Sequence, residues 1–93
     1  MKIVHEVEGQ KGKFFIKPEY ETLAEMTYSK AGTRMIIIDH TEVSEELKGQ
    51  GIGKKLVYEA VEWARKNNMK IIPLCPFAKS VFQKEKEIRD VLS

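Results

Sequence analysis

The chain has 93 residues and 42% hydrophobic side chains, which is enough for one compact globular domain over residues 1–93 and argues against disorder. A net charge of +2 excludes a strongly basic nucleic-acid-wrapping protein, although a local basic patch stays compatible with it. The single cysteine excludes an internal disulfide framework and favours a reducing cytoplasm. No apolar run approaches the ~20 residues of a membrane helix, and the first residues lack a signal-peptide core.

The first half of the chain predicts strands. Short apolar runs over Ile3–Val7 and Phe14–Ile16 are bounded by glycine and proline. From Leu23 to Ser29 apolar and polar residues alternate, which predicts a strand with one face on a core. After a turn at Lys30–Gly32, the next strand, Met35–Val43, begins with a β-branched run that is typical of a strand covered on both faces. We expect a three- or four-stranded antiparallel meander.

The second half predicts helices around one further strand. Apolar residues recur at helical spacing over Ile52–Lys66, and the two asparagines that follow can end this helix. The strand Ile71–Cys75 contains Pro73, which donates no ladder hydrogen bond, so we expect it at an edge or beside a gap in the sheet. A last helix is expected from Pro76 to about Leu92.

These elements give an α+β fold in which antiparallel strands precede a βαβ unit and a C-terminal helix. The strands Met35–Val43 and Ile71–Cys75 should run parallel, joined by a right-handed crossover through the helix between them. Ligands of such units bind beyond the carboxyl ends of the strands, which places a site near His40–Glu45 and near Cys75.

Three glycines at alternate positions open the strongest predicted helix. Each glycine costs about 1 kcal/mol relative to alanine inside a helix, so a compensating role is expected for Gly49, Gly51 and Gly53. Glycines let a backbone approach a phosphate closely, and the free N–H groups and dipole of a helix N-terminus favour an anion. Lysines at positions 48, 54 and 55 add positive charge there. The alternative is a glycine-rich turn that binds nothing.

The spacing of this turn separates classes of phosphate-binding loop. A Walker A loop and a dinucleotide-binding G-x-G-x-x-G loop both need glycine at the position of Lys54, so both fail. The run Lys48–Gly53 resembles [Arg/Gln]-x-x-Gly-x-[Gly/Ala], the acyl-CoA pyrophosphate loop of the GNAT acetyltransferase superfamily. Lys48 departs from that pattern, since it keeps the charge but lacks a planar bidentate group.

The resemblance to the small GNAT-like N-acetyltransferases extends over nearly the whole chain. Segments His40–Val43, Gly49–Gly53 and Ile72–Phe77 are similar to the family in order and spacing, and Leu23–Tyr28 resembles its third-strand segment. The resemblance implies a minimal GNAT fold and an acyltransferase that uses acetyl-CoA as cofactor and transfers an acetyl group to an unidentified amine. It implies a pantetheine arm between two splayed parallel strands and a pyrophosphate on the glycine loop. The implied CoA-binding residues are Thr41, Glu42, Val43, Lys48, Gly49, Gln50, Gly51, Ile52, Gly53 and Lys54.

The same resemblance makes Cys75 and His40 the candidate catalytic residues. Larger GNAT enzymes usually carry a tyrosine in the last helix as general acid, but the comparable stretch Val81–Gln83 has none, which shifts attention to Cys75. This thiol precedes a helix, where positive potential lowers a thiol pKa; it would accept the acetyl group or protonate the departing thiolate. The alternative is a small buried hydrophobe. His40 is either a base for the amine or a structural histidine. The two residues lack the further ligands of a zinc site.

Two other functions remain open at this level. One is a non-catalytic module that binds CoA or acyl-CoA, and the other is a small RNA- or nucleotide-binding protein that uses the lysines of the loop. Nucleic acid is disfavoured, because the lone aromatic residues suit packing better than base stacking. The acidic run Glu42, Glu45 and Glu46 is either a solvated face or an attractor for a cationic amine. We expect a monomer or a weak homodimer, with the edge Ile71–Leu74 as one interface.

Overall fold

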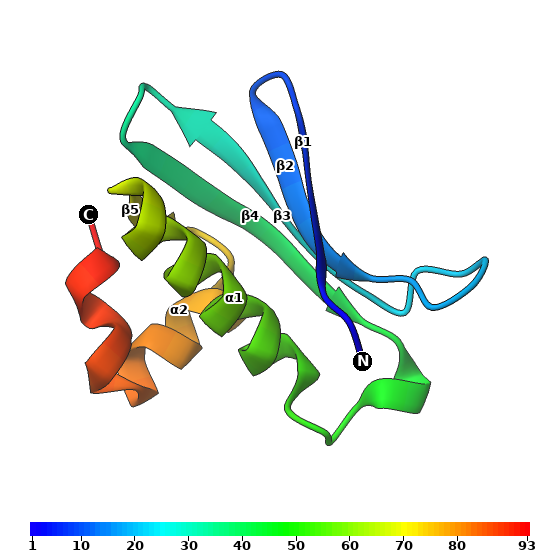
Figure 1. Cartoon of the computed structure of the whole chain (residues 1–93). Helices are drawn as coiled ribbons and strands as arrows, with labels where there is room; N and C mark the ends of the chain where they lie inside the picture. Colours follow the sequence, from blue (N-terminus) through cyan, green and yellow to red (C-terminus); the bar gives the residue numbers. More distant parts are fainter.

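The computed structural model describes residues 1–93 and forms one five-stranded sheet with helices packed against it (Figure 1). The strand order is β1-β2-β3-β4-β5; the first four strands are antiparallel, and β5 runs parallel to β4. The α+β fold with its βαβ unit is therefore confirmed. The elements are β1 Val4–Glu8, β2 Lys11–Ile16, β3 Ala24–Ala31, β4 Met35–Val43, α1 Ile52–Asn67, β5 Lys70–Pro73, α2 Pro76–Lys84 and two short 3₁₀ helices, Glu45–Leu47 and Lys86–Val91.

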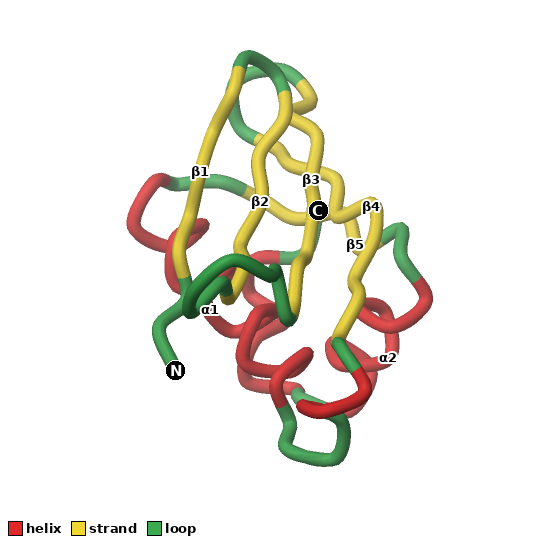
Figure 2. Tube along the Cα trace, turned by 90° about the vertical axis from the view of Figure 1, so that its right-hand side faces the viewer, coloured by secondary structure: helices red, strands yellow, loops and turns green.

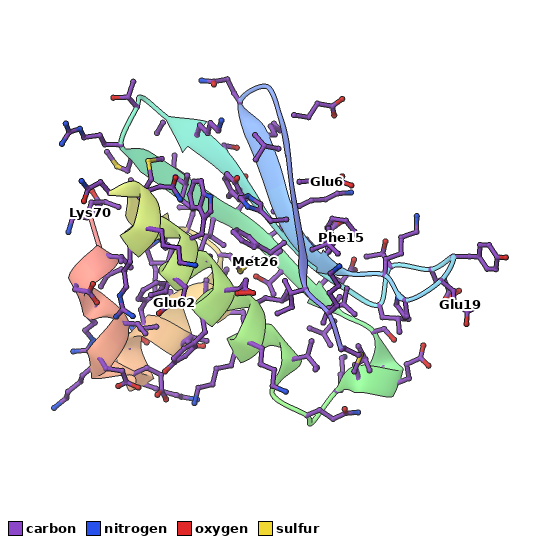
Figure 3. The ribbon with its side chains drawn as sticks, viewed as in Figure 1. Glu6, Phe15, Glu19, Met26, Glu62 and Lys70 are labelled. Carbon is purple, nitrogen blue, oxygen red and sulfur yellow. The ribbon has the colours of Figure 1, made fainter.

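Both helices cover the same face of the sheet, and the other face is open (Figures 1 and 2). Met26 points from β3 toward the helices and is fully buried, whereas the exposed Glu6 on β1 points away from them (Figure 3). In β4, Ile36 and Ile38 are buried on the helix side, but Ile37 stays half-exposed. The prediction that this strand is covered on both faces is wrong, because no helix precedes β4 to cover its second face.

An aromatic cluster fills the core beneath β1, β2 and β3. The His5 ring stacks on Phe14 at a centroid distance of 4.1 Å and lies edge-on to Trp63 of α1 at 5.2 Å. Tyr28 completes the cluster, with its hydroxyl 2.6 Å from His5 Nε2. Gly12 lies against the Tyr28 ring, where a Cβ would come within 2.3 Å of Cζ. These contacts fix the antiparallel half of the sheet on α1.

A β-bulge in β4 changes which side chains face the helices. Thr27 pairs with His40 and Tyr28 pairs with Ile38, so Asp39 is the extra residue. Because neighbouring residues of a strand point to opposite faces, one extra residue exchanges the two faces beyond it. After the bulge, Thr41 is opposite the buried Met26, so Thr41 rather than His40 faces the helices.

Strands β4 and β5 pair only along part of their length. The ladder joins Met35–Ile38 to β5 and ends at Pro73, after which the N–H groups of Leu74 and Cys75 both donate to the Ile38 carbonyl, at 3.1 and 3.0 Å. From Asp39 to Val43, β4 has no strand on its outer side. The prediction of an edge strand beside a gap is confirmed, and the gap lies at the carboxyl ends of both strands.

The C-terminal part of the chain differs from the prediction of one helix to Leu92. Helix α2 ends at Lys84, and Lys86–Val91 forms a 3₁₀ helix instead. Leu92 then forms a parallel bridge to Ile71, and the Ser93 N–H donates to the Ile71 carbonyl at 3.0 Å. These residues occupy the outer edge of β5, so the predicted interface along Ile71–Leu74 is partly covered within the chain itself. No helix combines the length and apolar character needed to cross a membrane.

Candidate active site

The glycine turn before α1 is shaped by left-handed backbone. Gly49 has φ 82° and Gly51 has φ 71°, and a Cβ at either position would meet no atom within 4 Å. Gly51 is the N-cap of α1, no side chain caps the helix, and its first turn contains no acidic residue. The first intrahelical bond runs from Lys55 N–H to the Gly51 carbonyl at 3.1 Å, so the N–H groups before it have no partner in the helix. An uncapped helix N-terminus with open space above it suits an anion.

A cavity of about 690 Å³ extends from this turn between β4 and α2. Its size lies within the range of small-molecule sites. The structure brings together nearly all of the predicted CoA-binding residues there. Gln50 is the exception, because its side-chain amide donates to the Glu46 carbonyl at 3.3 Å and it does not line the cavity. The lining residues are Thr41, Glu42, Val43, Leu47, Lys48, Gly49, Gly51, Ile52, Gly53, Lys54, Phe77, Ser80, Val81, Lys84 and Glu85.

Two of the three lysines that line the cavity, Lys48 and Lys54, form ion pairs with carboxylates. Lys54 Nζ lies 3.2 Å from Glu85 Oε2 and also lies over the Tyr58 ring. The Tyr58 hydroxyl lies 2.9 Å from Glu85 Oε1; this hydrogen bond and Lys54 hold the pKa of Glu85 below its usual range. Lys48 Nζ makes a separate contact of 2.8 Å with Glu45. The neighbouring Lys55 is exposed and outside the cavity. An anionic ligand would therefore compete with Glu85 for Lys54.

Cys75 is the N-cap of α2 at the point where β4 and β5 separate. Its Sγ lies 3.4 Å from Thr41 Oγ1, and the residue is only 6% exposed. Burial raises the pKa of the thiol, but the nearby Thr41 hydroxyl and the backbone N–H groups at the start of α2 favour the charged form more strongly and lower the pKa overall. The sulfur is thus a candidate thiolate, although Cys75 does not line the cavity.

His40 does not share this environment. It is exposed, it pairs with Thr27 on the open face of the sheet, and it is not among the lining residues of the cavity. The expectation that His40 and Cys75 face one crevice is corrected by the bulge at Asp39, which turns His40 outward and Thr41 inward.

Sequence reasoning missed the wall that α2 contributes to the cavity. Phe77, Ser80, Val81 and Lys84 line it from this helix, and Glu85 lines it from the residue that follows. The helical spacing of these residues places them along one side of α2, which is a signal that the sequence contains. Which side faces the cavity depends on how α2 packs on β4, and the sequence alone does not determine that.

The comparisons with known proteins agree with this geometry. The family model of GCN5-related N-acetyl-transferases matches residues 13–91. A GCN5-like protein from Staphylococcus aureus, assigned to the N-acetyltransferases, is 43% identical, with a TM-score of 0.72 over 97% of this chain and 87% of that one.

More distant structures share the fold. A ribosomal-protein-alanine N-acetyltransferase from Brucella melitensis biovar Abortus is 15% identical, with a TM-score of 0.69 over 83% of this chain and 62% of that one. Tetrahymena GCN5 is 16% identical, with a TM-score of 0.67 over 83% of this chain and 51% of that one. No curated protein matches the sequence. The family model covers most of the chain and the Staphylococcus aureus relative nearly all of it, so the chain belongs to the GCN5-related N-acetyltransferase family.

Proposed function

We propose that this protein is an acetyl-CoA-dependent N-acetyltransferase whose acceptor is an amine. The observation that carries the proposal is the uncapped N-terminus of α1, opened by left-handed Gly49 and Gly51 at one end of a cavity that runs along the unpaired edge of β4. Family membership agrees with it.

The residues present fit the cofactor. The free N–H groups of the first turn of α1 and Lys54 would hold the diphosphate, and the open space above Gly49 and Gly51 leaves room for its oxygens. Backbone groups of Thr41–Val43, which have no strand on their outer side, would hold the amides of the pantetheine arm. When bound, acetyl-CoA supplies an acetyl group activated as a thioester.

Cys75 is the group that would act on the reacting atoms, and Thr41 would position it. As a thiolate, the Cys75 sulfur would form a bond to the acetyl carbon while the thioester bond breaks and CoA leaves as a thiolate. The amine would then attack the same carbon, release the Cys75 thiolate and lose a proton to solvent. As a thiol, it would instead give its proton to the departing sulfur while the amine attacks directly. The Thr41 hydroxyl, 3.4 Å away, holds the sulfur in either role. His40 lies on the open face and would act as a base only on an amine that approaches from that side.

The proposal is tested by calorimetric titration of CoA against the wild type, Gly51→Asp and Gly9→Asp. Both glycines have positive φ, and a Cβ at either would meet no atom within 4 Å, so the two variants place the same strain and charge on the backbone. Of the two, only Gly51 lies in the glycine turn that lines the cavity. We expect Gly51→Asp to weaken CoA binding by about 100-fold or more through charge and bulk, and Gly9→Asp to bind as the wild type does. A wild type that does not bind CoA would refute the proposal.

A second candidate is a non-catalytic module that binds CoA or acyl-CoA. It is favoured by the low exposure of Cys75, which is 6%, and by the separation of His40 from the cavity. Mass spectrometry after incubation with acetyl-CoA, together with assays of amine-dependent release of CoA thiol, separates the two. An acetyl adduct on Cys75, or release that is lost in Cys75→Ala, supports the enzyme. Tight CoA binding without release with any of a broad panel of amines supports the module.

A further inference from the structure

The three glycines of the turn are required for different reasons. Gly49 and Gly51 have positive φ and no neighbour within 4 Å of a Cβ, so the shape of the backbone calls for them. Gly53 is helical and its φ is not positive, yet a Cβ there would lie 2.6 Å from Phe77 Cζ and 2.7 Å from Cε2. A glycine is therefore required at position 53 because the Phe77 ring packs on it, and not because of the backbone shape of the turn.

Phe77 is unusual among the large apolar residues of α2. Val81 and Phe82 are buried, but Phe77 is 42% exposed and lines the cavity. From the first turn of α2 its ring reaches the first turn of α1, where it touches Gly53. The clashing atoms belong to the end of a partly exposed side chain, so a methyl group at Gly53 would displace the ring rather than separate the helices.

The Phe77 ring connects the helix start with the neighbourhood of Cys75. It lies against Gly53, in the turn that offers free N–H groups to a diphosphate, and it stands two residues beyond Cys75, which under the proposed function acts at the thioester end. A ligand that reaches from one end to the other must pass the ring with its linking segment. In CoA this segment is pantetheine, a flexible chain with apolar methyl groups that suit an aromatic surface.

We infer that the pantetheine arm of CoA packs on the ring of Phe77, and that Gly53 leaves the space in which this ring lies. This inference rests on the proposed function. It concerns recognition of the arm and not of the diphosphate. The general loop pattern accepts alanine at the position of Gly53. In this chain alanine would move the wall, because Phe77 occupies that space.

The experiment compares two ligands by calorimetry: CoA, and 3′-phosphoadenosine 5′-diphosphate, which lacks the pantetheine arm. The proteins are the wild type, Gly53→Ala, Phe77→Leu and the double variant. We expect each single variant to weaken CoA binding about fivefold or more and to leave the nucleotide within about twofold. The double variant should bind CoA no more weakly than Phe77→Leu alone, since the alanine then has no ring to displace.

Other results would overturn the inference. If Gly53→Ala lost equal affinity for CoA and for the nucleotide, this glycine would serve the diphosphate. If Phe77→Leu bound CoA with unchanged affinity, the pantetheine arm would not pack on Phe77. In the NMR spectrum of ligand-free Gly53→Ala, we expect the signals of the Phe77 ring to shift. Unshifted signals would contradict the claim that Gly53 determines the position of the ring. If Gly53→Ala does not fold, Phe77→Leu with the two ligands still decides. A wild type that binds neither ligand refutes the proposed function instead.

Discussion

The antiparallel half of the sheet and the parallel half differ in how completely they are paired. In the first half, β1, β2 and β3 pair along their whole lengths and lie over the aromatic cluster of His5, Phe14, Tyr28 and Trp63. In the second half, β4 and β5 part after Ile38, and α1 begins without a side-chain cap. Unpaired backbone groups weaken a fold but can bind a ligand. We therefore infer that the first half mainly stabilises the molecule and that the second half provides the proposed CoA site.

The largest effect on stability is expected for Phe14→Ala. The side chain is 1% exposed and stacks on His5, so its loss leaves a cavity in the core. Such truncations cost about 3–5 kcal/mol, a large part of the stability of a small domain. Urea denaturation should show this loss, while the folded fraction binds CoA with wild-type affinity.

Phe77→Ala is the matched control in the other half. Its ring is 42% exposed, so truncation should cost much less stability than at Phe14 and weaken CoA binding instead. If Phe14→Ala weakened CoA binding in the folded protein, or if Phe77→Ala unfolded it, the two halves would not divide stability and binding in this way.

A smaller effect is expected at the ion pair between Lys54 and Glu85. Lys54→Ala should weaken CoA binding about tenfold, because a charge-assisted contact to phosphate is lost and Glu85 stays negative in the cavity. Glu85→Gln should act in the opposite direction, since it frees Lys54. Lys55→Ala is the control, because Lys55 lies outside the cavity. Titrations at low salt measure all three, and equal effects at Lys54 and Lys55 would indicate a diffuse basic patch instead of a defined contact.

The parts of the fold that the sequence predicts are those with strong local patterns. Alternation over β3, the apolar stripe of α1 and the proline in β5 all appear in the structure in their expected places. The sequence also indicates where the glycine loop lies, since no other run of this chain combines three glycines with a helix start. The wrong predictions, namely a β4 covered on both faces, an inward-facing His40 and one helix to Leu92, depended on packing between elements.

His40 shows why the rest escaped prediction. Alternation from Ile36 and Ile38 places residue 40 on the helix side, but one extra residue at Asp39 exchanges the faces. Nothing in the sequence Asp39-His40-Thr41 marks a bulge, because it arises from the register of β3 on β4. The 3₁₀ segment after Lys84 is similar: Arg89 donates to the Phe82 carbonyl at 2.7 Å, and Arg65 of α1 contacts Asp90, so tertiary contacts replace a longer helix.

The smallest predicted effect is the pH dependence of the aromatic cluster. Burial and the charge of Lys30 lower the pKa of His5, while Glu59 opposes them. A lowered pKa means that the folded protein binds this proton more weakly than the unfolded chain does. Stability is then complete above about pH 6.5, the ordinary histidine value, and falls as the pH drops from there toward the pKa of the folded state.

Urea midpoints measured between neutral and mildly acidic pH test this prediction. His5→Gln keeps a hydrogen-bonding group beside the Tyr28 hydroxyl but does not titrate, so it should flatten the decline. CoA affinity of the folded protein should not follow the titration of His5, which belongs to the stabilising half. A decline that persists in His5→Gln would move its source elsewhere. A CoA affinity that fell along with the wild-type midpoints, and recovered in His5→Gln, would show that the aromatic cluster and the cavity are coupled through α1.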